Sequence, residues 1–173
     1  MIYRGPAFRA HNPRWSWLPT SGEGAALYGG RFNAKGVPAL YLATDMATAM
    51  REVAHGFPTR LVDPLTIVSY AVDCADIVDL TSMRVLRAKA ITPDQLACGW
   101  LLLQEAGKPV PSQAIAHRLI AEGAAGILVR SFAPGSSAEN INLVLWRWSE
   151  KPPHQVRVHD PGKRLPKDDS SWS

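Results

Sequence analysis

The sequence predicts a single α+β domain. Strand-like apolar segments fall into two blocks, within residues 2–80 and 126–159, and helical segments are expected inside the first block and between the two. Because strands and crossover helices do not alternate regularly, a doubly wound parallel sheet is disfavoured. The chain of 173 residues is 46% hydrophobic and 20% charged, which suits one domain with its own core. We therefore expect one domain over 1–173, with an irregular polar tail from about residue 161.

In the first block the elements follow the spacing of apolar residues and turn signals. The expected order is a strand over 2–9 that is broken at Gly5-Pro6, a helical turn over 25–28, a strand over 37–43, a helix over 46–55, and strands over 65–72 and 76–80. The strand over 37–43 is apolar on both sides, so it should be central in its sheet. In the helix that Thr44 or Asp45 caps, Glu52 lies at the border of an apolar stripe that begins at Met46. A carboxylate at that border faces either solvent or a cleft beside the strand.

Two helices are expected between the blocks. The first begins at Thr92-Pro93-Asp94, which supplies a cap, a proline at the first helical position and an acid in the first turn, and it runs to about residue 106. The second spans 112–121 and is closed by Gly123. Three strands are expected to follow, over 126–132, 141–148 and 155–159.

Composition and charge disfavour several classes of protein. The net charge of +4 comes from scattered basic residues without a run of five like charges, so nucleic-acid binding is not favoured. No apolar run approaches the roughly 18 residues of a membrane span, and the N-terminus lacks the apolar core of a secretion signal. Cys74 and Cys98 lie in apolar contexts, so we expect two reduced, buried thiols in a cytoplasmic protein.

The sequence lacks the common cofactor and nucleophile motifs. Gly22-Glu23-Gly24 has no third glycine at the spacing of a dinucleotide fingerprint, and it follows a proline- and tryptophan-rich loop instead of a strand. The five histidines are dispersed and no CxxC pair occurs, so no metal site is expected. There is also no Walker loop and no Gly-x-Ser-x-Gly elbow.

One stretch, residues 21–52, combines the residue types of a ligand site. Five glycines fall within about 15 residues around Arg31, and glycine permits tight turns and the close approach of other groups. Arg31 is a planar fork for anions, Tyr41 offers a stacking face, and Glu52 supplies a carboxylate. Each of these alone is more often structural: an exposed arginine, a core tyrosine or a solvated glutamate. Together with the glycines they indicate a functional site.

Further motifs along the chain agree with this site. They are Tyr3-Arg4, residues 21–25, 29–33 and 35–43, Ala49, Glu52-Val53, residues 129–132 and residues 142–146. In this order they resemble the RES-domain family, which is named for an arginine, a glutamate and a serine. The family's serine corresponds to Ser131, and its later asparagine corresponds to Asn142. The resemblance covers nearly the whole chain.

The resemblance implies a fold similar to that of ADP-ribosyltransferases: two packed β-sheets that form a split barrel, with flanking helices. RES proteins are typically toxins of bacterial type II toxin–antitoxin systems, and a cognate antitoxin with an Xre-like DNA-binding region neutralises them. They act on NAD+, which some members hydrolyse or phosphorolyse and others use to transfer ADP-ribose to a protein. We therefore expect NAD+ as a substrate, no metal, an antitoxin and a host-protein target as partners, and no direct contact with nucleic acid or membrane.

In this family setting, Glu52, Arg31 and Tyr41 are the expected catalytic residues. Breaking the nicotinamide–ribose bond passes through an oxocarbenium-like state, so negative charge near the ribose favours the reaction. We expect Glu52 to bind the ribose hydroxyls and stabilise that state. Arg31 would hold the pyrophosphate or the ribose, and Tyr41 would stack on nicotinamide or pack against the ribose.

Other residues have expected roles around the same substrate. Arg4, or its competitor Arg9, would contact a phosphate or the adenosine of NAD+. Ser131 would position the substrate by its hydroxyl and would not act as a nucleophile, because no base is evident for it. Asn142 is expected to be structural.

Three classes of function stay open at this point. The leading one is a toxin that transfers ADP-ribose from NAD+ to a host protein, with an NAD+ glycohydrolase or phosphorylase as the alternative. The second class is an inactive relative that binds a nucleotide or a partner in the same cleft, and the presence of Arg31, Tyr41 and Glu52 argues against it. The third, nucleic-acid binding or modification, is suggested only by the charge.

Overall fold

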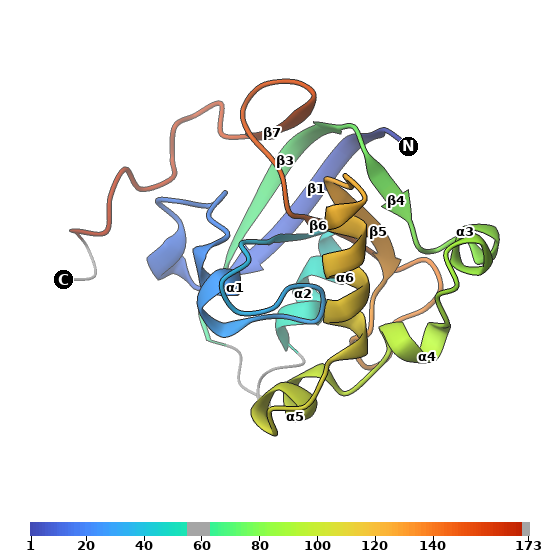
Figure 1. Cartoon of the computed structure of the whole chain (residues 1–173). Coiled ribbons are helices and arrows are strands. Elements are labelled where there is room, and N and C mark those ends of the chain that lie inside the picture. The colour runs from blue at the N-terminus through green and yellow to red at the C-terminus, as the bar shows by residue number, and fades with distance from the viewer. Residues whose placement is uncertain (55–62, 171–173) are drawn as a thin grey trace.

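The structure, a computed structural model, describes residues 1–54 and 63–170 (Figure 1). Its elements in chain order are β1 (Tyr3–His11), a 3-10 turn η1 (Pro13–Trp15), α1 (Glu23–Tyr28), β2 (Leu40–Ala43), α2 (Met46–Ala54), β3 (Thr66–Cys74), β4 (Ile77–Asp79), α3 (Met83–Ala88), α4 (Pro93–Leu96), α5 (Trp100–Glu105), α6 (Pro111–Ala121), β5 (Gly126–Arg130), β6 (Ile141–Leu145) and β7 (His154–Val158). The last residue of the helix predicted over 46–55 lies outside the described residues.

The strands form a seven-stranded sheet with the order β4-β5-β6-β2-β1-β3-β7. The pair β4–β5 is parallel and the other neighbouring pairs are antiparallel. β2 stands in the middle of this order, as its continuous apolar sequence predicts. The strand that carries Tyr41 is therefore held by a neighbour on each side.

The α+β class is confirmed, but the prediction of two packed sheets is corrected to one hydrogen-bonded sheet. Among the described residues, β1 pairs with β3 along its whole length and with β2 at one position, Phe8 opposite Ala43. This contact joins β4-β5-β6-β2 to β1-β3-β7. Buried side chains of both halves, among them Leu42, Val72 and Leu143, share one core. The sequence could not reveal the link, because a single residue pair leaves no signal in the apolar periodicity.

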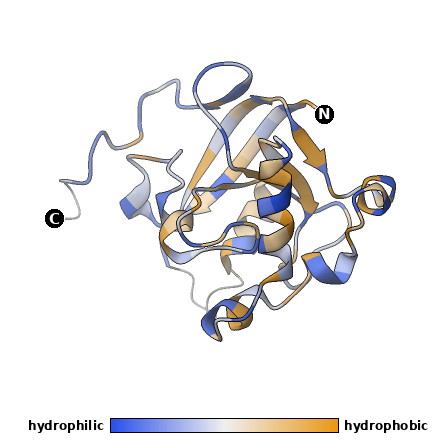
Figure 2. Ribbon diagram, in the orientation of Figure 1, coloured by the Kyte–Doolittle hydropathy of each residue, from blue (hydrophilic) through white to orange (hydrophobic). Residues whose placement is uncertain are grey.

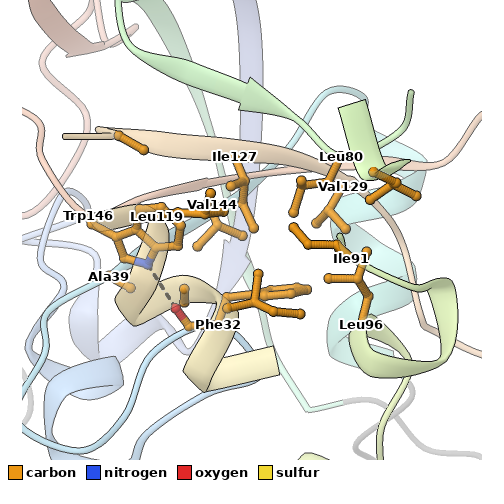
Figure 3. Close-up of a cluster of buried hydrophobic side chains, with 14 residues drawn as sticks. Phe32, Ala39, Leu80, Ile91, Leu96, Leu119, Ile127, Val129, Val144 and Trp146 are labelled. Carbon is orange, nitrogen blue, oxygen red and sulfur yellow. Dashed lines mark hydrogen bonds between the residues drawn. The ribbon is translucent and has the colours of Figure 1, made fainter. Parts of the chain in front are cut away.

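A second core lies between β5, β6 and the helices α3, α4 and α6 (Figure 3). Leu119 of α6, Ile127 of β5 and Val144 of β6 are among its buried residues. The glycine-rich loop after α1 adds Phe32, whose carbonyl accepts a 2.8 Å hydrogen bond from the indole N–H of Trp146. Burying a phenylalanine side chain contributes about 1.5–3 kcal/mol. The core therefore anchors the loop that carries the predicted site.

The helix predicted over 92–106 is in fact two helices, α4 and α5. Its start is as predicted, because Thr92 and Gln95 form a capping box at the beginning of α4. The helix stops after one turn, and the backbone N–H of Trp100 then donates to the carbonyl oxygen of Cys98. The helix α3 was not predicted, whereas α6 confirms the helix predicted over 112–121.

Two local predictions also need correction. β1 does not break at Gly5-Pro6: it pairs there with β3, where Pro6 is opposite Ala71, and a strand with one open side tolerates a proline. The stripe predicted to begin at Met46 is displaced, because Met46 is 54% exposed and Thr48 is fully buried. Of the two candidate caps, Asp45 accepts a 2.8 Å hydrogen bond from the backbone N–H of Thr48.

The tail from residue 161 is irregular and contains no strand among its described residues. Figure 2 shows that it is mostly hydrophilic, whereas most of β4 is hydrophobic. None of the helices in the described ranges has the length and apolar character needed to cross a membrane.

Candidate active site

A cleft beside the glycine-rich loop brings together three of the predicted site residues. It has a volume of about 500 Å³, and Arg31, Tyr41 and Glu52 all line it. Tyr41 comes from β2, Glu52 from α2 and Arg31 from the loop after α1. A smaller cavity of about 160 Å³ shares Arg9, Tyr41, Glu52 and Asn142 with the cleft.

The glycine-rich loop is folded around Asn33 and Tyr41. Asn33 is 1% exposed, and its Nδ2 donates to the backbone carbonyl oxygens of Ala25, Ala34 and Val37. Gly29 ends α1 with a φ of 75°, a conformation that glycine adopts without strain. At Gly30 an added Cβ would lie 2.5 Å from the Tyr41 hydroxyl oxygen. Both glycines are therefore required by the packing of the loop itself.

The hydroxyl of Tyr41 is fully used inside the protein. It donates a 2.7 Å hydrogen bond to Oδ1 of Asn33 and accepts a 3.0 Å hydrogen bond from the backbone N–H of Phe32. Burial raises the pKa of Tyr41, so the phenol stays protonated. Tyr41 therefore presents its ring to the cleft, while its oxygen holds the loop next to Arg31.

Arg31 is held by the break between α4 and α5. Its Nη1 donates to the carbonyl oxygens of Leu96, at 3.1 Å, and Cys98, at 2.7 Å. The guanidinium carbon lies 4.4 Å from the ring centroid of Phe132, a cation–π contact. Partial burial lowers the pKa of Arg31, while Cys98, Glu52 and Tyr41 shift it in the opposite direction. Its Nε and Nη2 make no hydrogen bond to the described residues, and this edge of the fork suits a bidentate anion.

The first turn of α6 supports the same loop from behind. The hydroxyl of Ser112 donates a 2.6 Å hydrogen bond to the carbonyl oxygen of Arg31, and Nε2 of Gln113 donates to that of Gly30 at 2.9 Å. Ser112 has no exposed surface. The backbone on both sides of the Arg31 side chain is thus tied to a helix, which limits how far the guanidinium can move.

Glu52 receives two short hydrogen bonds on one oxygen. Its Oε1 accepts from the hydroxyl of Ser131 and from Nδ2 of Asn142, both at 2.6 Å. Ser131 also contacts the hydroxyl of Ser136 at 2.8 Å and accepts from the backbone N–H of Ala133 at 3.2 Å. The second oxygen, Oε2, accepts no hydrogen bond from the described residues. The carboxylate is therefore oriented on one side and open on the other.

The remaining predicted substrate contacts fall in different places. Ser131 is 9% exposed and does not line the cleft. It contacts Glu52, which does line the cleft, by its hydroxyl group. Arg4 does not line the cleft: its exposed guanidinium pairs with Asp73 at 2.9 Å on the outer part of β1 and β3. Its competitor Arg9 lines the cleft and donates through Nη1 to two backbone carbonyl oxygens. Burial lowers the pKa of Arg9.

Sequence reasoning did not identify every residue that builds the site. Phe132, which stacks under Arg31, and Asn33, which holds Tyr41, had no predicted role, and Asn142 was expected to be structural. Asn33 and Phe132 lie within the motif segments 29–33 and 129–132, and this was the signal that could have identified them. Within residues 1–54 and 63–170, no group of three or more His, Cys, Asp or Glu side chains is arranged to hold a metal ion.

The chain is similar to known proteins in sequence and in structure. Residues 6–168 match the RES domain, so the protein belongs to the RES-domain family, as its motifs predict. No curated protein sequence matches the chain. A chain in the crystal structure of the M. tuberculosis MbcT–MbcA toxin–antitoxin complex has a similar structure, with a TM-score of 0.66 and 24% sequence identity. The match covers 92% of this chain and 84% of that chain, and at this identity it shows a shared fold.

Proposed function

We propose that the protein is the NAD+-consuming toxin of a bacterial type II toxin–antitoxin system. In this proposal it cleaves the nicotinamide–ribose bond of NAD+ and transfers ADP-ribose to a host protein. The observation that carries the proposal is the convergence of Arg31, Tyr41 and Glu52 on one cleft, with the carboxylate of Glu52 held at one oxygen and open at the other. NAD+ is a substrate here, and the proposed chemistry uses no metal.

Glu52 supplies the negative charge that the reaction requires. As the glycosidic bond breaks, its electron pair leaves with nicotinamide and positive charge develops on the ribose. A fixed carboxylate at the ribose stabilises that charge, and the open oxygen of Glu52 can also accept hydrogen bonds from ribose hydroxyls. The acceptor then forms a bond to the anomeric carbon and releases its proton to solvent. Ser131 acts through Glu52 in this scheme.

Arg31 and Tyr41 hold the dinucleotide. The Nε and Nη2 edge of Arg31, which makes no hydrogen bond within the described part of the chain, matches two oxygens of the pyrophosphate. Tyr41 offers its ring to nicotinamide or to the ribose, since its hydroxyl is bonded to Asn33. Of the two candidates for a further phosphate contact, Arg9 is better placed than Arg4, because it lines the cleft.

Family membership and the similar fold support the role of a toxin. The structural neighbour belongs to a toxin–antitoxin complex, and we propose that this chain also has a cognate antitoxin with an Xre-like DNA-binding region. Covering the cleft would be the most direct way for such a partner to block the reaction. Acidic side chains on the antitoxin would complement the net charge of +4.

The acceptor is tested with labelled substrate. The purified protein is incubated with NAD+ labelled in the adenylate phosphate and with a bacterial lysate, beside Glu52→Gln and the control Glu139→Gln, which changes an exposed carboxylate in the β5–β6 loop. We expect label in a protein band with the wild type and with Glu139→Gln, and none with Glu52→Gln. If the label appears in free ADP-ribose or its 1″-phosphate and in no protein, the reaction is NAD+ breakdown and not transfer to a protein. Unchanged NAD+ with a folded wild type would contradict the proposal and favour a binding module.

A further inference from the structure

Asn142 reaches Glu52 from the interior of the sheet. It lies on β6, where it pairs with Ala43 of β2 and with Val129 of β5, so neighbouring strands flank it on both sides. Glu52 comes from α2, on a separate part of the chain. The 2.6 Å hydrogen bond from Nδ2 of Asn142 to Oε1 of Glu52 therefore ties a helix side chain to the centre of the sheet.

The hydrogen bonds of Asn142 are unlike those of a structural asparagine. Its Oδ1 is buried and has no hydrogen-bond partner among the described residues. By contrast, Asn33 uses both ends of its amide inside the loop. Asn140 also uses both ends, donating to Thr48 at 2.8 Å and accepting from the backbone N–H of Ser137 at 2.8 Å. Burying an unpaired carbonyl oxygen is unfavourable, and an asparagine with a purely structural role would use both ends of its amide in hydrogen bonds. The placement of the Asn142 amide therefore does not serve the stability of the interior.

The orientation of the Asn142 amide is set by the charge of Glu52. Turning the amide over would put Oδ1 against Oε1, two acceptors at hydrogen-bond distance, which repel each other. The observed orientation leaves Oδ1 without a partner in the described ranges and gives the carboxylate a second donor beside Ser131. Asn142 also lines both the cleft and the smaller cavity next to it. Its contact with Glu52 is therefore at the wall of the site.

We propose that Asn142 is a positioning residue for Glu52. Together with Ser131 it occupies Oε1, fixes the rotation of the carboxyl group, and directs Oε2 to the substrate. This inference rests on the proposed use of Glu52 in NAD+ cleavage. It predicts that loss of the Asn142 amide impairs the chemical step more than the binding of NAD+, because Arg31 and the ring of Tyr41 remain in place.

The kinetic test compares Asn142→Ala and the isosteric Asn142→Asp with Asn140→Ala and Asn140→Asp on NAD+ consumption. For both Asn142 variants we expect kcat to fall about tenfold or more while KM changes less than about threefold. In Asn142→Asp, the new carboxyl group lies at hydrogen-bond distance from that of Glu52. Because two carboxylates repel each other at this distance, one proton is retained to higher pH, and the acid limb of the pH–kcat profile moves to higher pH. The other titratable side chains that line the cleft in the described part of the chain are unchanged in all variants; they are Arg9, Tyr28, Arg31 and Tyr41.

A second readout needs no catalysis. In protein with ¹³C-labelled glutamate, the side-chain carboxyl signal of Glu52 is assigned by its loss in Glu52→Gln and is followed against pH. We expect its titration midpoint to rise in Asn142→Ala, rise further in Asn142→Asp and stay unchanged in the Asn140 variants. An unchanged midpoint in both Asn142 variants would overturn the inference, as would wild-type kcat in either variant. A shifted midpoint in a protein that does not consume NAD+ would support the positioning contact while removing the proposed function.

Discussion

The guanidinium of Arg31 donates a 2.7 Å hydrogen bond to the backbone carbonyl oxygen of Cys98, at the point where α4 and α5 separate. In a continuous helix the carbonyl groups of this segment would accept from backbone N–H groups four residues later. Because the helix is interrupted here, the carbonyl oxygens of Leu96 and Cys98 can both accept from Arg31. A local interruption of secondary structure thus holds the cation of the site.

Replacing Arg31 with lysine tests whether the fork itself matters. Lys keeps the charge but cannot contact both carbonyl oxygens and still offer two parallel donors to a pyrophosphate. We expect Arg31→Lys to raise KM for NAD+ by about tenfold to a hundredfold, with the fold retained. Steady-state kinetics checks this, and Arg118→Lys, which alters an exposed arginine bonded to the carbonyl of Lys89, is the control. An unchanged KM would show that Arg31 does not bind the substrate.

The Tyr41 hydroxyl is predicted to act on stability. In Tyr41→Phe the backbone N–H of Phe32 and Oδ1 of Asn33 each lose a hydrogen-bond partner, whereas the ring still lines the cleft. Leaving such buried groups unpaired costs about 1–3 kcal/mol in the free energy of unfolding. Urea unfolding measures the change, and Tyr28→Phe, at a tyrosine that is 74% exposed, should leave stability unchanged. A Tyr41→Phe protein as stable as the wild type would contradict the role of this hydroxyl in the loop.

Ser131 should affect turnover through Glu52. Ser131→Ala removes one of the two donors on Oε1, and we expect kcat to fall about tenfold with little change in KM. Ser137→Ala is a matched control in the same region, because the Ser137 hydroxyl contacts Asn140. Equal kcat values for Ser131→Ala and Ser137→Ala would show that the Ser131 hydroxyl has no role in turnover.

Acid should destabilise the fold through His11. Burial, together with the nearby charge of Arg9, lowers the pKa of His11 from 6.5 to about 4. Between these pH values the unfolded chain binds a proton that the folded chain does not, so the free energy of unfolding decreases as the pH falls through this window, by up to about 3 kcal/mol. Urea unfolding across the window should give a shallower pH dependence for His11→Gln. The exposed His117→Gln variant should follow the wild type, and identical curves for all three proteins would refute the assignment.

Much of the fold could be predicted because apolar spacing and capping residues act locally. The central strand β2 and the helices α2 and α6 follow directly from such patterns. The break in the segment over 92–106 was missed, although Gly99, the N-cap residue of α5, lies in it. The contact of this break with Arg31, more than 60 residues away in sequence, had no local signal. The one-sheet architecture was missed for the same kind of reason: the pairing of Phe8 with Ala43 is a tertiary contact.

The candidate site was predicted in composition but not in detail. Arg31, Tyr41 and Glu52 could be selected because an arginine, an aromatic residue and a carboxylate follow a dense run of glycines. The hydrogen bonds that hold them could not be predicted: Ser131 and Asn142 were named from the family motifs, but Asn142 lies 90 residues from Glu52 and reaches it only when β6 is placed beside β2. Long-range contacts of this kind carry no periodic signal in a single sequence.

The central claim is that these three side chains act on one NAD+ molecule, and cellular NAD+ is the most direct measure of it. NAD+ is quantified before and after induction of the wild type and of Glu52→Gln, at matched protein levels, in bacteria that lack the antitoxin. NAD+ should fall with the wild type and stay near its starting level with folded Glu52→Gln. We expect the turnover of this variant to be reduced by a factor of about 100 or more. Constant NAD+ with the wild type, or an equal fall with the variant, would contradict the claim.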